Sequence, residues 1–190
     1  NFIRVIFEDS KGNLWVGTYG GGLCLMKDEK FIVYNTTHGL PNNAIRVIYE
    51  DRRGTLWIGA REGLIRFKDG KFSTVPMEGN SSFNMINTFM EDTDENLWIG
   101  TETMGIYRLK DSTFKSYTEH EGLSGGTAWC VFMDRKNKIW VGMRSGLYYY
   151  HDHQGKFSRY YAANDSFDTV INAVLEDNQG NYWIGTEGEG

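Results

Sequence analysis

The hydrophobic and polar positions of the chain follow one pattern that returns five times. In its second occurrence an apolar segment rich in β-branched and aromatic residues, Ile45–Asp51, is followed by a polar turn and a second apolar segment, Thr55–Ala60. A third segment, Leu64–Asp69, alternates apolar and polar residues, and the more polar Lys71–Val75 follows it after an Asp-Gly turn. Short runs of this kind, separated by Gly-containing turns, predict antiparallel strands joined by hairpins. We therefore expect four strands per repeat, the first most apolar and the last most polar.

One tryptophan lies at the same place in every repeat, on the predicted second strand. An aspartate precedes each tryptophan by six positions, and a glycine follows it by two. The five tryptophans, separated by 41 to 43 residues, are Trp15, Trp57, Trp98, Trp140 and Trp183. A period of about 40–45 residues is typical of a four-stranded propeller blade. The spacing therefore predicts an all-β β-propeller of four-stranded antiparallel blades, with four complete blades and half of a fifth, as a fragment of a larger propeller.

The expected blades cover residues 1–41, 42–83, 84–125 and 126–168, and the half-blade covers residues 169–190. We expect the five tryptophans at equivalent buried positions between blades, and Trp129 outside this set on an innermost strand. The turn between the first two strands has glycine in three repeats, but Glu95 and Asn137 take its place in the third and fourth. Because Asn tolerates the left-handed conformation better than Glu, the turn at Glu95 should be strained or rearranged.

Composition narrows the possible functions. The net charge is −5, with acidic and basic residues interspersed, which argues against a nucleic-acid surface. No apolar run approaches the roughly 18–20 residues of a membrane span, so we expect no membrane segment in this fragment. The two cysteines, Cys24 and Cys130, fall at different places in repeats one and four, so we expect two small buried hydrophobic residues rather than a disulfide.

Candidate metal and catalytic groups are few. His151 and His153 could face one side of a strand end and hold a metal, but no third ligand is apparent, and a turn is the simpler interpretation. The sequence from Asp92 to Asn96 resembles the opening of a calcium loop, yet Leu97 stands where such a loop needs glycine. We therefore expect no catalytic residue, no metal and no cofactor in this segment.

The positions that vary between repeats are the better candidates for binding. In a propeller, the loops between the second and third strands open on the same face as the connections between blades. Arg, Asn and Trp also occur near the channel end of the innermost strands, where an aliphatic residue would be ordinary. Such a polar and aromatic rim suits a polar small molecule or an oligosaccharide, and the alternative is a solvated surface. The candidates are Arg4, Arg46, Asn87, Trp129 and Asn172 on the strands, and Tyr19, Arg61, Glu102 and Arg144 in the loops.

The string ED-x-x-G-x-LW-[IV]-GT-x-x-GL, followed by KF-x-x-Y and GLPNN, resembles the regulator-propeller repeat of bacterial two-component sensors. Glu95, Asn137 and Met133, which replaces the Glu before the turn, depart from the pattern, but they concern turn geometry. The resemblance covers the whole chain. It implies a non-catalytic, periplasmic or extracytoplasmic sensing segment of an inner-membrane hybrid histidine kinase, whose kinase would lie in domains outside this sequence.

Two other functions stay open. Streptogramin-lyase-like enzymes use related propeller repeats, and a purely structural or dimerisation scaffold would bind no small molecule. Because four and a half blades would leave apolar residues such as Ile3 and Val174 uncovered in an open arc, we also expect either self-association through the open propeller ends or marginal stability that further blades would relieve.

Overall fold

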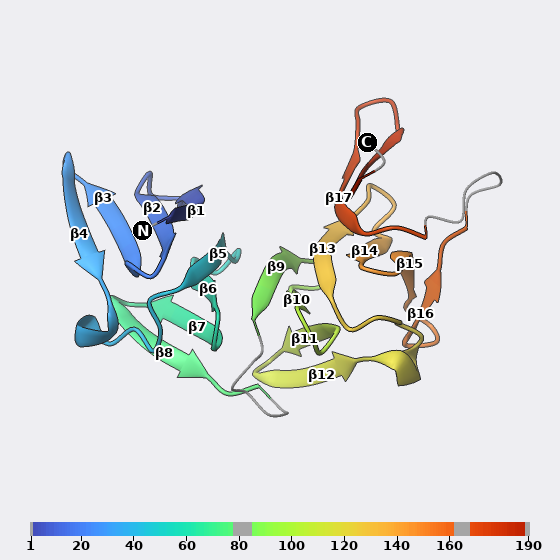
Figure 1. The fold of residues 1–190 in the computed structure, drawn as a ribbon, viewed down its shortest axis with the longest axis horizontal. Helices are drawn as coiled ribbons and strands as arrows, with labels where there is room; N and C mark the ends of the chain where they lie inside the picture. Colours follow the sequence, from blue (N-terminus) through green and yellow to red (C-terminus); the bar gives the residue numbers. More distant parts are fainter. Residues whose placement is uncertain (1, 78–84, 162–167, 189–190) are drawn as a thin grey trace. The chain divides into compact units, whose positions relative to one another are not determined.

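The computed structural model describes residues 2–77, 85–161 and 168–188. Within these residues the chain forms β-sheets apart from two short 3-10 turns, and it divides into two compact units, Asn1–Ile86 and Asn87–Gly190. In every sheet each strand pairs with the next strand of the sequence, and all the pairs are antiparallel (Figure 1).

The first unit contains two four-stranded sheets. The first sheet consists of β1 (Phe2–Glu8), β2 (Leu14–Tyr19), β3 (Leu23–Lys27) and β4 (Lys30–Tyr34). The second consists of β5 (Ile45–Glu50), β6 (Leu56–Ala60), β7 (Gly63–Lys68) and β8 (Lys71–Val75). The connection between the sheets contains the 3-10 turn η1 (Thr36–His38), which Asn35 caps by accepting a hydrogen bond from the N–H of Thr37.

The second unit contains two four-stranded sheets and a two-stranded one. They are β9 (Ile86–Glu91), β10 (Leu97–Thr101), β11 (Ile106–Lys110) and β12 (Thr113–Tyr117); β13 (Ala128–Met133), β14 (Ile139–Met143), β15 (Gly146–His151) and β16 (Lys156–Arg159); and β17 (Ile171–Glu176) with β18 (Tyr182–Thr186). The 3-10 turn η3 (Glu119–Glu121) lies between β12 and β13. These sheets confirm the predicted four-stranded antiparallel blades.

The fixed spacing of Asp and Trp has a direct structural cause. In all five repeats the Oδ2 atom of the aspartate accepts a hydrogen bond from the indole Nε1 of the tryptophan six positions later, at 2.7–3.0 Å. The Oδ1 atom accepts backbone N–H groups two and four positions after the aspartate, as at Asp9 with Lys11 and Asn13. One carboxylate therefore closes the hairpin turn and fixes the orientation of the tryptophan.

The turn at Glu95 is strained rather than rearranged. Glu95 has a φ of 60°, in the region that glycine occupies at Gly12 and Gly54 with φ of 77° and 70°. Asn137 takes a φ of 62° at the same place in the fourth blade. The carboxylate of Asp92 holds this turn with the same set of hydrogen bonds as in the other blades, so the sequence change alters the backbone energy and keeps the geometry.

The second strand of a blade is the most buried one, whereas the apolar pattern pointed to the first strand. Every residue of β6, β10 and β14 is buried, whereas β5, β9 and β13 are buried only in part. A second strand has sheet neighbours along both edges and a blade against its face, which explains the difference.

Four tryptophans are buried as expected, with Trp15, Trp57, Trp98 and Trp140 exposed by 2, 8, 1 and 7%. The expectation is wrong for Trp183, which is 64% exposed. Its hydrogen bond to Asp177 is present, so its local conformation matches the others. The difference lies in the neighbour, because Trp15, Trp98 and Trp140 each contact a ring of the following sheet, namely Phe67, Tyr150 and Tyr182.

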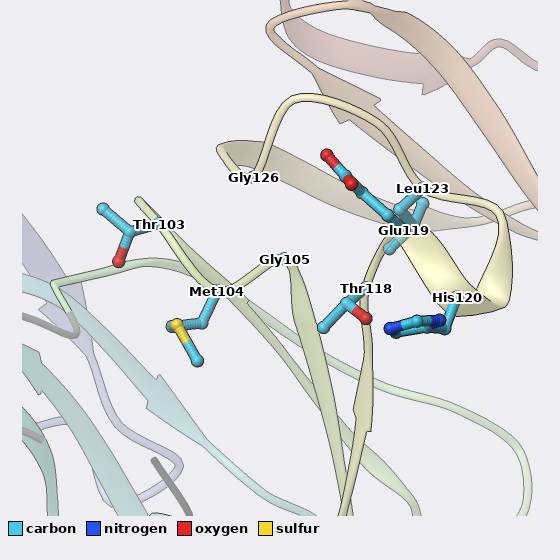
Figure 2. A pocket seen from close by; sticks show the side chains of 8 residues that line it. All are labelled: Thr103, Met104, Gly105, Thr118, Glu119, His120, Leu123 and Gly126. Atoms are coloured by element: carbon cyan, nitrogen blue, oxygen red, sulfur yellow. The ribbon is translucent and has the colours of Figure 1, made fainter. Parts of the chain in front are cut away.

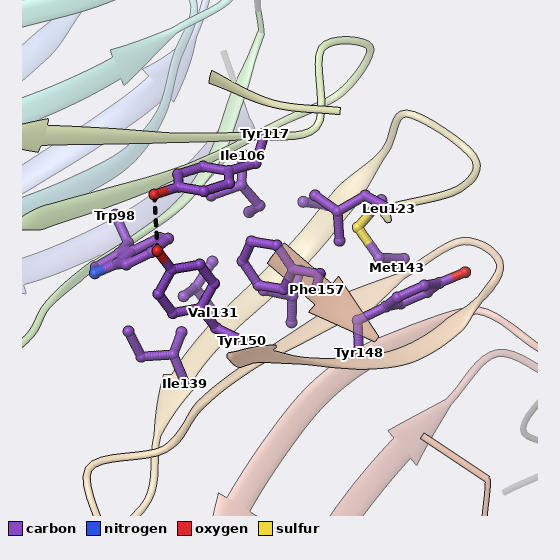
Figure 3. Packing of buried hydrophobic residues seen from close by; sticks show 12 residues of the cluster. Trp98, Ile106, Tyr117, Leu123, Val131, Ile139, Met143, Tyr148, Tyr150 and Phe157 are labelled. Carbon is purple, nitrogen blue, oxygen red and sulfur yellow. Dashed lines mark hydrogen bonds between the residues drawn. The ribbon is translucent and has the colours of Figure 1, made fainter. Parts of the chain in front are cut away.

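The core of the second unit is built from these aromatic contacts between blades (Figure 3). Trp98 lies 5.0 Å, between ring centroids, from Tyr150 of the next blade, and Tyr117 lies 5.4 Å from Phe157. The hydroxyl groups of Tyr117 and Tyr150 are 3.1 Å apart and share a hydrogen bond inside the cluster. The two blades are therefore joined by packing and by a satisfied polar contact. In the described part of the chain no helix is long and apolar enough to cross a membrane.

Candidate functional site

The candidate positions on the innermost strands coincide with irregularities in the sheets. The pairing register of β1 with β2 shifts between Ile3 and Val5, so Arg4 falls at the shift. The corresponding shifts leave Arg46, Trp129 and Asn172 in the same position on β5, β13 and β17. A β-bulge leaves one residue outside the ladder, redirects its side chain, and is frequent beside binding sites. Each of these four candidates therefore occupies a place that regular alternation does not constrain.

Four of the nine candidates come together in the first unit. Arg4, Tyr19, Arg46 and Arg61 line one small depression of the surface with Ala44, Ile45 and Met85. The Nη1 atom of Arg61 donates a hydrogen bond to the hydroxyl of Tyr19 at 3.2 Å, and the guanidinium of Arg4 lies 5.6 Å from the centroid of the Tyr19 ring. Arg46 contacts the sulfur of Met85. We call Arg4, Tyr19, Arg46 and Arg61 the arginine cluster.

The backbone below this cluster is fixed at Ala44. Tyr19 forms an isolated antiparallel bridge with Ala44, and the N–H of Arg61 donates to the carbonyl of Ala44 at 3.0 Å. Ala44 belongs to the connection between the blades, whereas Tyr19 and Arg61 begin the loops between second and third strands. Both kinds of loop therefore meet on one face, as the sequence predicted.

The second unit places the other candidates in separate surroundings. Asn87 is partly buried and donates from Nδ2 to the carbonyl of Ala128 at 3.0 Å, so its amide joins neighbouring blades. The carbonyl of Glu102 accepts a hydrogen bond from the hydroxyl of Thr127. The N–H of Arg144 donates to the carbonyl of Thr127. Arg144 and Asn172 are exposed, and Trp129 is half-buried. Their part in binding stays a prediction.

A pocket of about 290 Å³ lies on the loop face of the second unit (Figure 2). Met104 enters it from the loop between β10 and β11, and Thr118 and His120 enter it from the connection after β12. Thr103, Gly105, Glu119, Leu123 and Gly126 complete the lining. His120 and Met104 were not among the candidates from the sequence, although the candidate Glu102 lies in the same loop as Met104.

Backbone contacts hold this pocket in shape. The N–H of Gly105 donates to the carbonyl of Gly126 at 2.7 Å, and Gly105 has a positive φ of 68°. A Cβ atom at Gly105 would lie 2.4 Å from the carbonyl oxygen of Tyr117, so this close approach requires glycine. The side chain of Glu121 accepts hydrogen bonds from the N–H and the hydroxyl of Thr118 at the start of η3. These bonds hold the pKa of Glu121 below its ordinary value, although burial acts in the opposite direction.

Three of the titratable groups with shifted pKa values are aspartates of the repeated turns: Asp9, Asp134 and Asp177. Burial raises the pKa of Asp9, but hydrogen bonds from Trp15 and Asn13 outweigh it, so that the pKa lies below its ordinary value. Burial also raises the pKa of Asp134, but hydrogen bonds from Trp140 and Tyr182 outweigh this effect, so that the pKa lies below its ordinary value. Burial and the hydrogen bond to Asp134 raise the pKa of Tyr182 to about 12. These shifts follow from burial and from the hydrogen bonds that form around the turns.

The histidines take part in local contacts. The Nδ1 atom of His38 lies 2.9 Å from the Oδ1 of Asn35, and the Nε2 atom of His151 lies 2.9 Å from the hydroxyl of Ser158. Over the residues that the structure describes, no group of three or more His, Cys, Asp or Glu side chains is arranged to hold a metal ion.

The chain resembles solved propeller structures over almost its whole length. The extracellular domains assigned to the hybrid two-component systems BT3049 and BT4673 of B. thetaiotaomicron match 97% and 98% of the chain, with 23% and 24% identity and a TM-score of 0.82 in both cases. The chain covers 26% of each of those domains. Virginiamycin B lyase from Staphylococcus aureus matches 96% of the chain, which covers 62% of the enzyme, at 13% identity and a TM-score of 0.76.

These likenesses show the fold, and the sequence profile shows the kind of repeat. A comparison with curated proteins finds no significant match. The profile of the two component regulator propeller family matches residues 1–20, 39–62, 80–103 and 165–188, and each matched segment includes one first strand of a blade. The four matched segments are therefore two-component regulator propeller repeats, as the resemblance predicted.

Proposed function

We propose that the chain is a non-catalytic, ligand-binding segment of an extracytoplasmic sensor in bacterial two-component signalling. The repeat family and the extracellular domains of similar fold support this role and this location. The histidine kinase would belong to other domains of the parent protein. The expected ligand is a polar small molecule, with an oligosaccharide as the leading class.

The arginine cluster is the observation that carries this proposal. Guanidinium groups are rigid donors, and the aromatic face of Tyr19 offers a stacking surface of the kind that sugar rings use. The cluster stands at bulges and loop ends on a rigid sheet, where side chains can vary without disturbing the repeat. Met104, Thr118 and His120 offer a second set of polar and apolar contacts in the pocket of Figure 2.

The test is a binding screen of the chain against neutral and acidic oligosaccharides by thermal shift, followed by calorimetry of the hits. Arg46→Ala and Tyr19→Ala should weaken binding, while Arg66→Ala, an exposed residue of β7 outside the cluster, should leave it unchanged. Chromatography of the incubated ligand should show no new product. Turnover would favour the lyase-like alternative, and a complete lack of binding would favour a structural scaffold.

A further inference from the structure

The arginine cluster gathers like charges without a lining carboxylate. Arg4, Arg46 and Arg61 come from β1, β5 and the loop after β6, yet all three line the same depression. None of the described residues that line it is acidic. Two of these groups, Arg4 and Arg61, both contact Tyr19, and like charges held this close raise the local positive potential, which an anion would relieve.

Tyr19 organises two of these cations before any ligand arrives. Its hydroxyl accepts a hydrogen bond from Arg61, and its ring faces the guanidinium of Arg4. Ala44 anchors both Tyr19 and Arg61 through backbone hydrogen bonding. A guanidinium that is already oriented loses less freedom when it binds a carboxylate or sulfate in two-point contact.

We propose that the arginine cluster binds an anionic group of the ligand, a carboxylate or a sulfate ester on a saccharide. This inference rests on the proposed function, and it names the ligand class of the same site. The aromatic ring of Tyr19 would contact the sugar that bears the charge, and Arg4 and Arg61 would hold the anion.

Calorimetry of the chain with three probes tests the proposal: trigalacturonate, its neutral methyl ester, and sodium sulfate. Trigalacturonate should bind with an affinity that falls as salt rises, and Arg61→Gln should weaken it about tenfold or more. Arg66→Gln is the matched control and should stay within about twofold, as a charge change outside the site.

Each other outcome has a definite meaning. Equal affinity for the acid and its ester would overturn the anionic site while supporting the proposed binding of saccharides. Binding of sulfate at the cluster with no binding of either saccharide would support the anion site and contradict the oligosaccharide sensor. If Arg61→Gln and Arg66→Gln weaken binding equally, the cluster does not hold the anion.

Discussion

Replacing Glu95 by glycine should stabilise the protein. The left-handed conformation costs a residue with a Cβ atom about 1–2 kcal/mol, and glycine avoids this cost. Glycine in turn lowers stability by about 0.5–1 kcal/mol, because its unfolded state is more flexible. Glu95 has a φ of 60° in a turn whose hydrogen bonds match those of the glycine-containing turns. We therefore expect Glu95→Gly to raise the free energy of unfolding by about 0.5–1 kcal/mol.

The reverse change at an equivalent turn provides the control. Gly54 has a φ of 70°, and a Cβ atom there would lie 3.8 Å from the nearest atom, the Oε1 of Glu50. Because there is room, Gly54→Ala should lower stability through backbone strain alone, by about 1 kcal/mol. Urea unfolding followed by tryptophan fluorescence measures both variants. If Glu95→Gly does not stabilise while Gly54→Ala destabilises, the side chain of Glu95 contributes more than the strain, and the reasoning fails for that turn.

Three further predictions concern packing, pH and thiol reactivity. Trp57→Ala should cost about 3–5 kcal/mol as a large cavity in the core, whereas Arg61→Ala should cost under about 0.5 kcal/mol, and equal losses in urea unfolding would contradict the assigned burial. The pKa values of Asp9 and Asp134 are lowered in the folded state. The two ionised carboxylates therefore stabilise the folded protein fully above the ordinary pKa near 3.8, and this stabilisation is lost as the pH falls through the folded pKa values. An unfolding free energy that does not change between pH 5 and pH 2 would refute this reasoning. Burial raises the pKa of Cys130 to about 11, so iodoacetamide should label it slowly at pH 8 in the folded protein and rapidly in urea, as mass spectrometry can show.

The sequence predicted the elements of the fold because its repeats carry several independent constraints at once. The spacing of tryptophans, the turn residues and the alternation of apolar positions all indicate the same strands, and the structure contains them. The hydrogen bond from Trp15 to Asp9 was not predicted, although its signal was present in the constant separation of six residues. The separation indicates the repeat, whereas the structure shows its chemical cause: Oδ1 of Asp9 accepts the turn N–H groups and Oδ2 accepts the indole N–H.

Burial was harder to predict than strand position, because it depends on the neighbouring blade. Trp183 and Trp140 occupy the same position of the repeat and form the same bond to an aspartate, yet their exposed fractions are 64% and 7%. Local sequence determines the conformation of each tryptophan, whereas the ring of Tyr182 covers Trp140 from another sheet. A prediction made from one repeat therefore cannot give the exposure of a residue that a different repeat covers.

The bulges explain why the variable positions of the innermost strands are suited to binding. A residue in a regular strand must alternate between the two faces, and a change there disturbs the packing of a blade. Arg4 and Arg46 lie at register shifts, where the ladder does not impose this alternation. The same place in other blades holds Trp129 and Asn172, residues of very different size and charge, while the strands around them keep their pairing. The fold thus separates the residues that hold blades together from the residues that can differ between them, and side chains can change at the bulges without loss of the blade pairing.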